Sequence, residues 1–352
     1  MPGNHIEVAA KIRQRIEAGE YTSDRPLPAE RVLSEAFDVH RATLRRAIVS
    51  LEASGHVRRA PGERPYPLPP ARSLEGTIGL YATDEDVYSR SLIATGVVEA
   101  LRERGSALRL VWSDDRPFQT GEPFPPEIRS HVGMILWPPA LTDADRLREL
   151  RESMPTVIVD APVSGYESDF VGFDDEAGGY EAARHLVESG HRALAFVGPL
   201  QVVTARYRRH GFLRLLHERG LEPVGGYESL AYADRLPGSV LDAFLDVRRP
   251  GRPTAFVCEN DETAALLMPH FAARGLRVPE DFALIGFGGV QSVLLDALGL
   301  TSMEQPFIEV GRRAAFLLLD RLNGESREAE RIRLSMRLRA RSSSDHERVA
   351  AL

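Results

Sequence analysis

Apolar residues recur at helical spacing three times in the first 51 residues and predict three short helices. The first is expected over residues 6–16, and the second over residues 28–37, before the turn Asp38-Val39-His40. The third helix follows that turn. Its inner stripe consists of Leu44, Ala47, Ile48 and Leu51.

A short strand and a turn follow the third helix. Gly55 ends the helix, residues 56–59 are expected as a strand, and Pro61-Gly62 forms the tip of a wing. Two helices around a tight turn, with a wing behind them, present the second helix of the pair to the DNA major groove. The outward positions and the N-terminal end of that helix carry His40, Arg41, Ala42, Thr43, Arg45 and Arg46. Because its free N–H groups attract anions, this end is expected beside a DNA phosphate.

From residue 76 the pattern changes to an alternation of strands and helices. Short apolar runs predict parallel strands over 77–81, 108–112, 132–137, 156–160, 193–197, 254–258 and 282–286. Helical periodicity fills 92–104, 143–153, 176–189, 206–219, 239–245 and 261–274. The fold class is therefore doubly wound α/β, which binds ligands beyond the carboxyl ends of its strands. Polar residues at such ends are Thr83, Asp84, Asp160, Asp174, Asp175, Asn260 and Asp261.

Four prolines between residues 65 and 70 separate the two patterns. Because proline continues neither a helix nor a central strand, we expect a stiff linker over residues 67–75. It follows a winged helix-turn-helix domain over 1–66 and precedes a receptor domain over 76–345.

Charge is distributed unevenly between these parts. The chain has a net charge of -7, yet residues 1–72 hold 12 basic and 9 acidic residues. Positive charge is thus concentrated where the DNA-binding domain is expected. Cys258 is the single cysteine, which excludes an intramolecular disulfide and a cysteine-based zinc site. With no secretory signal and no membrane span visible, we expect a cytoplasmic protein.

Residues 5–66 resemble the winged-helix domain of the gluconate-repressor (GntR) family in both spacing and residue types. The resemblance implies that Arg31, His40, Arg41, Thr43 and Arg45 contact DNA and that Gly62 lets the wing approach a phosphate. Arg46 joins them on the outer face. The wing departs from the family, because Arg64-Pro65 stands where a second glycine and a threonine are usual. Arg64 is expected to enter the minor groove instead.

The receptor resembles the effector domain of lactose-repressor (LacI/GalR) regulators over residues 76–342. The resemblance is carried by 171–178 (VGFDDEAG), 185–191 (HLVESGH), 196–199 (FVGP), 205–212 (ARYRRHGF), Asn260-Asp261 and 284–287 (LIGF). It implies two lobes with crossings near Gly172, Met303 and Ser326. Lobe 1 would comprise about 76–172 and 304–325, and lobe 2 about 173–303 and 326–345. The expected effector-binding residues are Thr83, Val87, Asp160, Arg208, Tyr232, Asn260, Phe287 and Gln305.

Two departures from this family concern the effector. Gly288-Gly289 replaces the usual acidic ligand contact, and Leu298-Gly299 replaces a usual proline pair. Losing an acceptor beside Arg208 would make the site more positive. We therefore hypothesise an effector with fewer hydroxyls there, or one with a negative group. Altered or lost effector binding is the third alternative.

Other chemistry finds little support in the sequence. Asp174-Asp175 is read as a helix cap, and His185, His191, His210 and His217 lack metal spacing. Cys258 is expected as a core residue of a strand. We expect no catalytic residue, cofactor or metal. The combined resemblance, similar to arabinose-type repressors, predicts a homodimer that binds a near-palindromic double-stranded DNA operator and a sugar or sugar derivative.

Alternatives remain open from the sequence. They are a cytoplasmic sugar-binding protein or a sugar-active enzyme without a DNA-binding role, an activator, and a repressor that answers a protein partner.

Overall fold

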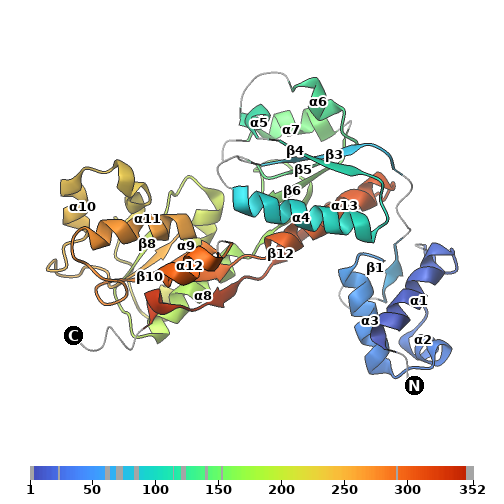
Figure 1. Cartoon of the computed structure of the whole chain (residues 1–352), viewed down its shortest axis with the longest axis horizontal. Helices are drawn as coiled ribbons and strands as arrows, with labels where there is room; N and C mark the ends of the chain where they lie inside the picture. Colours follow the sequence, from blue (N-terminus) through green and yellow to red (C-terminus); the bar gives the residue numbers. More distant parts are fainter. Residues whose placement is uncertain are drawn as a thin grey trace.

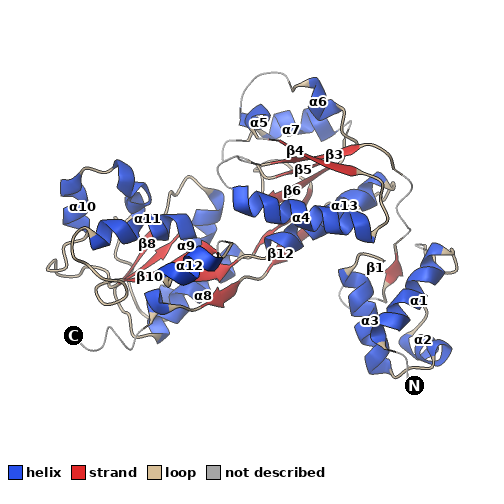
Figure 2. Ribbon diagram, in the orientation of Figure 1, coloured by secondary structure: helices blue, strands red, loops and turns tan. Residues whose placement is uncertain are grey.

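The structure, a computed structural model, describes residues 4–22, 24–59, 64–68, 74–82, 87–113, 115–119, 124–138, 142–151, 154–290 and 292–345. It consists of a small helical domain at the N-terminus and two α/β lobes (Figures 1 and 2). Within the described residues, no helix has the length and apolar character needed to span a membrane.

The N-terminal domain is the expected winged helix. It contains α1 (His5–Glu17), α2 (Glu30–Phe37) and α3 (Arg41–Ala53), with strands β1 (Val57–Arg58) and β2 (Tyr66–Pro67) paired antiparallel. Asp38 makes the turn between α2 and α3 in the left-handed conformation, at φ 51°. Strand β2 and Leu68, whose N–H donates to the His56 carbonyl, extend this domain into the segment expected as linker. The small core is formed by Val8, Ile12, Ile16, Leu27, Leu33, Leu44, Ile48, Leu51 and Val57.

Lobe 1 is built on a six-stranded sheet of order β12-β7-β6-β5-β3-β4, parallel throughout. Its strands are β3 (Thr77–Tyr81), β4 (Arg109–Ser113), β5 (Gly133–Leu136), β6 (Thr156–Asp160), β7 (Asp169–Phe173) and β12 (Arg331–Leu334). Helices α4 (Val87–Glu103) and α13 (Phe307–Leu322) cover one face. The other face carries α5 (Arg116–Gln119), α6 (Pro126–Arg129) and α7 (Ala144–Arg151).

Lobe 2 is built on a five-stranded sheet of order β13-β11-β10-β9-β8. Its strands are β8 (Leu194–Val197), β9 (Ala255–Cys258), β10 (Ala283–Gly288), β11 (Thr301–Glu304) and β13 (Arg337–Arg339), the last antiparallel. Helices α8 (Asp175–Glu188) and α9 (Val203–Glu218) pack on one face. The 3₁₀ helix η1 (Glu228–Arg235), α10 (Gly238–Phe244), α11 (Asp261–Ala272) and α12 (Ser292–Leu298) pack on the other. A short 3₁₀ helix, η2 (Ser342–Ser344), follows β13.

The chain passes between the two sheets three times. It leaves lobe 1 between β7 and α8, returns between β11 and α13, and leaves again between β12 and β13. The prediction that the third crossing lies near Ser326 is wrong by about ten residues. Since β12 pairs with β7 along its whole length, residues 326–334 remain with lobe 1, and the crossing lies at Ser335-Met336.

Glycines let the two covering helices of each lobe touch at their backbones. In lobe 1 a Cβ added to Gly96 would lie 1.9 Å from the Ile308 carbonyl oxygen, and one on Gly311 would lie 2.0 Å from the Ile93 carbonyl oxygen. In lobe 2, Gly179 and Gly211 stand in the same relation to α9 and α8. Any larger residue must push the helices apart, because the obstacle is backbone rather than a movable side chain.

We therefore expect Gly311→Ala to lower the free energy of unfolding by about 2 kcal/mol, the order of other overpacking changes. Gly225→Ala is the matched control, since nothing lies within 4 Å of its added Cβ. Urea unfolding measures both variants. Equal stabilities for the two would contradict the close helix contact.

Candidate DNA-binding face and effector cleft

Helix α3 presents an exposed basic face. Leu44, Ala47 and Ile48 are buried, whereas Arg41 and Arg46 are exposed and have no ion-pair partner within the described part of the chain. His40 is the N-cap residue, with extended backbone and no capping hydrogen bond from its side chain. The helix end therefore retains N–H groups that favour an anion.

Two of the predicted DNA contacts are engaged within the domain. Arg31 pairs with Glu35 on α2 at 2.8 Å, and the Arg45 Nε donates to Glu30 at 2.9 Å. All four side chains lie at the surface, so these pairs can exchange for phosphate at small cost.

The remaining predicted DNA contacts are placed less fully. Thr43 is half-buried in the first turn of α3, and Arg64 is exposed just before β2. Gly62 lies outside the described residues. The contacts of all these residues with DNA stay predictions.

A cavity of about 850 Å³ lies between segments of both lobes. Lobe 1 contributes the residues that follow β5 and β6, and lobe 2 contributes the N-terminal turns of α9. Three aromatic residues, Trp137, Tyr166 and Tyr207, and several polar ones line it. Its lining includes Trp137, Asp160, Gln201, Thr204, Tyr207 and Arg331.

Asp160 is the predicted effector residue that lines this cavity. It ends β6 with φ 66°, a left-handed conformation that an L-residue adopts at a cost. Such strain tends to accumulate at binding sites, where it aims a side chain. Asp and Asn tolerate this conformation better than most residues do.

Arg208 is held inside lobe 2. Its Nε donates to the Asp175 carboxylate at 2.8 Å, an Nη donates to the Glu259 carbonyl, and the guanidinium lies 4.7 Å from the centre of the Phe287 ring. Only 6% of Arg208 and 4% of Asp175 is exposed. Asp175 therefore supplies a charge opposite to that of Arg208 and opposes the expected shift of this site toward positive charge. The prediction that Asp175 caps the following helix is wrong, because Asp174 fills that role by accepting from the Ala177 N–H at 3.1 Å.

Carboxylates gather at the same end of the lobe 2 sheet. Asp261 accepts from the Gly289 N–H at 2.6 Å and from the Ser302 hydroxyl at 2.9 Å, so a carboxylate stands beside the glycine pair that lacks one. Burial raises the pKa of Asp261 and raises that of Glu259 to about 7. Burial likewise raises the pKa of Asp175, although Arg208 opposes this. The site is thus rich in acceptors despite Gly288.

The other predicted effector residues surround this cluster without lining the cavity. Asn260 caps α11 by accepting from the Thr263 N–H at 2.7 Å, and Phe287 is 1% exposed in β10. Gln305 donates its backbone N–H to the Gly288 carbonyl at 3.0 Å.

Of the other predicted effector residues, two lie on separate elements, and one lies outside the described residues. The Tyr232 hydroxyl accepts from Gln201 at 2.6 Å, and Val87, 50% exposed, begins α4. Thr83 lies outside the described residues. Their contacts with an effector stay predictions.

Most of the residues that line the cavity are not among those predicted from the sequence. Trp137 is the last residue of the strand expected over 132–137 and directly follows β5, so the strand-end rule could have found it. Thr204 and Tyr207 lie in the first turns of α9, which begins a few residues after β8, so the same rule applies. Arg331 had no such signal, because its place depends on the pairing of β12 with β7. Among the described residues, no group of three or more His, Cys, Asp or Glu side chains could hold a metal ion.

Comparison with known families divides the chain in the same way. Residues 5–66 match the bacterial regulatory proteins of the gntR family, and residues 183–344 match the periplasmic binding protein-like domain. The first match covers the winged helix, and the second covers most of lobe 2 together with the segments that return through lobe 1.

Individual relatives are similar over three quarters of the chain or more. The chain is 29% identical to the arabinose metabolism transcriptional repressor of Geobacillus stearothermophilus over 93% of each sequence. It is similar to the crystal structure of a LacI family transcriptional regulator from Enterococcus faecium with bound ribose (TM-score 0.62, 26% identity, 76% of this chain and 98% of that one). It is also similar to the transcriptional regulator CelR in complex with cellobiose (TM-score 0.61, 25% identity, 90% and 99%).

The buried pair yields a stability prediction. Arg208→Met should lower the free energy of unfolding by about 3 kcal/mol, because it strands the Asp175 charge in the interior. Arg184→Met, which removes exposed pairs with Glu181 and Glu188 on α8, should cost less than about 1 kcal/mol. Urea unfolding compares them. Similar small losses would mean that Arg208 does not depend on Asp175.

Proposed function

Since the chain joins a gntR-family DNA-binding domain to a periplasmic-binding-protein-like domain, we propose that it is a transcriptional repressor controlled by a sugar. It acts by binding rather than by catalysis, in the cytoplasm, where its operator DNA lies. The observation that carries this proposal is the presence, in one chain, of an exposed basic recognition helix and a cavity between two lobes.

The DNA-binding half of the proposal rests on α3. Arg41 and Arg46 extend from its exposed side, and arginine can bind guanine through two hydrogen bonds. Arg31 and Arg45, paired with carboxylates of the same domain, suit phosphate contacts that fix the orientation of the helix.

The sugar half rests on the character of the cavity. Aromatic rings pack against the apolar face of a sugar, and carboxylate, amide and hydroxyl groups exchange hydrogen bonds with its hydroxyls. Trp137 and Tyr207 supply the first kind of group, and Asp160, Gln201 and Thr204 the second. The solved relatives with bound ribose and with cellobiose, and the relative named for arabinose metabolism, support a neutral sugar.

Regulation follows from the position of the cavity. A sugar that contacts both lobes stabilises one angle between them, and it changes operator affinity only as far as its own affinity differs between the two arrangements. The chain crosses between the lobes three times, so this angle is the natural degree of freedom.

A homodimer completes the proposal. Strand β4 is the edge of the lobe 1 sheet and exposes Val111 and Trp112, and the nearby helix α4 exposes Tyr88 and Val98. An apolar sheet edge of this kind favours covering by a second chain. A symmetric dimer carries two recognition helices and so matches a near-palindromic operator.

The operator prediction tests the DNA-binding half. Selection of genomic fragments by the full chain should enrich one near-palindromic motif. Arg41→Ala and Arg46→Ala should each weaken binding to it about tenfold or more, the usual range for an arginine that reads a base. Arg13→Ala, an exposed arginine on α1, is the control and should bind as the wild type does. If no motif is enriched, the repressor proposal fails, and the chain is left as a sugar-binding protein or an enzyme.

The sugar prediction tests the cavity. Calorimetry with arabinose, ribose and cellobiose should find at least one ligand. Asp160→Asn should weaken it about tenfold, because a charged hydrogen bond is lost. Asparagine also tolerates the left-handed backbone, so the sugar-free melting temperature should not change. Unaltered affinity in this variant, or no binding of the three sugars, contradicts the proposed site.

A further inference from the structure

The winged helix is docked on lobe 1 through the turn that joins α3 to β1. Gly55 packs on the Phe316 ring, since an added Cβ there would lie 2.9 Å from the ring atoms. His56 is 8% exposed and Phe316 is 5% exposed, so both are covered in this arrangement. Burial, together with the charges of Arg104 and Arg13, lowers the pKa of His56 to about 4. A neutral imidazole therefore sits in the contact near pH 7.

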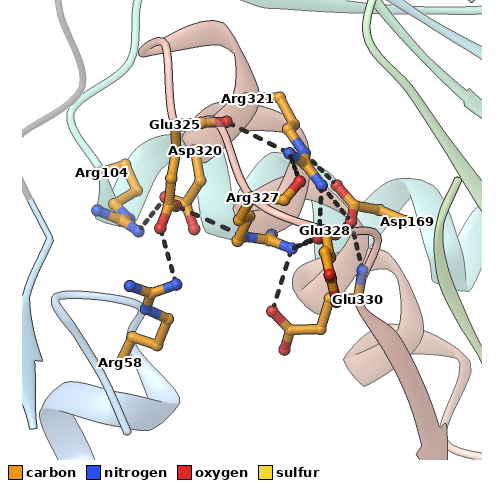
Figure 3. Close-up of polar contacts among 9 residues, drawn as sticks. All are labelled: Arg58, Arg104, Asp169, Asp320, Arg321, Glu325, Arg327, Glu328 and Glu330. Atoms are coloured by element: carbon orange, nitrogen blue, oxygen red, sulfur yellow. Dashed lines mark hydrogen bonds and ion pairs between the residues drawn. The ribbon is translucent and has the colours of Figure 1, made fainter. Parts of the chain in front are cut away.

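An ion pair crosses the same contact. Arg58 of β1 binds the carboxylate of Glu325, just beyond the end of α13, at 2.9 Å (Figure 3). Behind it, Arg104 and Asp320 form a buried pair at 3.1 Å on lobe 1. The second oxygen of Glu325 lies 3.7 Å from the Nε of Arg327. One carboxylate is thus shared between two arginines, one in each domain.

Arg327 belongs to a network centred on a buried carboxylate. Its Nη1 lies 3.1 Å from Asp169, which is 2% exposed at its side chain and also receives Arg321 at 2.7 Å. The Glu330 N–H donates to the same carboxylate at 2.7 Å. Burial alone would raise the pKa of Asp169, but these hydrogen bonds and charges lower it overall. Asp169 therefore stays ionised and holds the turn of residues 325–330 in place.

This turn is connected to the strands that lead into lobe 2. Asp169 begins β7, and the turn runs directly into β12. The two strands pair side by side, and both end at a crossing between the lobes. A change in the angle between the lobes therefore acts on two strands. At the ends of these strands away from the crossings lie Asp169, the first residue of β7, and Arg327, in the turn before β12.

The sharing of Glu325 is incomplete. Its Oε2, and the Nε and Nη2 of Arg327, are buried without a hydrogen-bond partner among the described residues. Unsatisfied buried donors are costly, and an arginine fork binds a carboxylate best through two parallel bonds. A small rotation of Glu325 toward Arg327 would satisfy these atoms and release Arg58.

We propose that Glu325 is a switch residue: it holds the DNA-binding domain on lobe 1 through Arg58, and it releases that domain when movement of β7 and β12 lets Arg327 take both of its oxygens. The surface formed by Phe316, Arg104 and Glu325 is thus a docking site for the chain's own winged helix. This inference rests on the proposed function for its regulatory role, but the docking itself does not depend on it.

Distances between spin labels at Glu7→Cys on α1 and Glu149→Cys on α7 test the docking in the full chain. Both positions are exposed, and Cys258 is fully buried, so it does not take a label. With doubly labelled chains diluted in an excess of unlabelled chains, so that distances within one chain are measured, the wild type should give one narrow distance distribution, and Arg58→Met should broaden it. Arg59→Met is the matched control, because Arg59 pairs at 3.7 Å with Glu52 of its own domain. An Arg58→Met distribution as narrow as the wild type overturns the docking contact.

A second variant tests the exchange. Arg327→Lys keeps a positive charge for Asp169 but cannot bind Glu325 through two parallel hydrogen bonds. It should keep the narrow distribution. The change in operator affinity caused by arabinose, ribose or cellobiose should fall below twofold, in this variant and in Arg58→Met, while sugar affinity is retained. A full sugar response in Arg327→Lys overturns the exchange. The distances between the spin labels are measured without operator or sugar. A failure of the docking contact is therefore distinguished from a failure of the proposed function.

Discussion

The buried carboxylate of Asp169 is the group on which the arrangement of the three parts depends. It stands at the start of β7 and receives Arg321 from the end of α13, Arg327 from the following turn and the N–H of Glu330 before β12. These contacts hold the end of α13 and the turn after it against β7, a strand that lies more than 150 residues earlier in the sequence. A buried carboxylate with several charged donors is held far more firmly than a surface ion pair. The same fastening sets the position of Glu325, and through it the contact with the winged helix.

The two lobes pack their helices in the same way. Each places two helices on one face of a sheet and lets their backbones touch at paired glycines, Gly96 with Gly311 and Gly179 with Gly211. Close backbone contact leaves each pair of helices little room to move against each other, so the three short crossings are the segments at which one lobe can turn relative to the other. The cavity lies between these rigid units, where a small ligand can bias their angle.

Local patterns predicted the elements well, because apolar periodicity and glycine or proline punctuation act within a few residues. The strand over residues 156–160 and the three helices of the winged domain follow their predicted ranges closely. Long-range pairing escaped prediction. The alternation in Arg331–Leu334 does not reveal which sheet the strand joins, and this misplaced the third crossing. Asp175 and Arg208 are 33 residues apart, so the neutralisation of Arg208 was equally hidden. Of the residues that line the cavity, the sequence predicted Asp160.

The return of the chain has a consequence for the order of events during synthesis. Lobe 1 takes α13 and β12 from the last fifty residues, whereas the winged helix is complete by Leu68 and most of lobe 2 by Glu304. On the ribosome, the DNA-binding domain and then lobe 2 can close while the lobe 1 sheet still exposes the face that α13 will cover. In a nascent chain the DNA-binding domain is therefore complete before lobe 1 has formed the surface on which that domain docks.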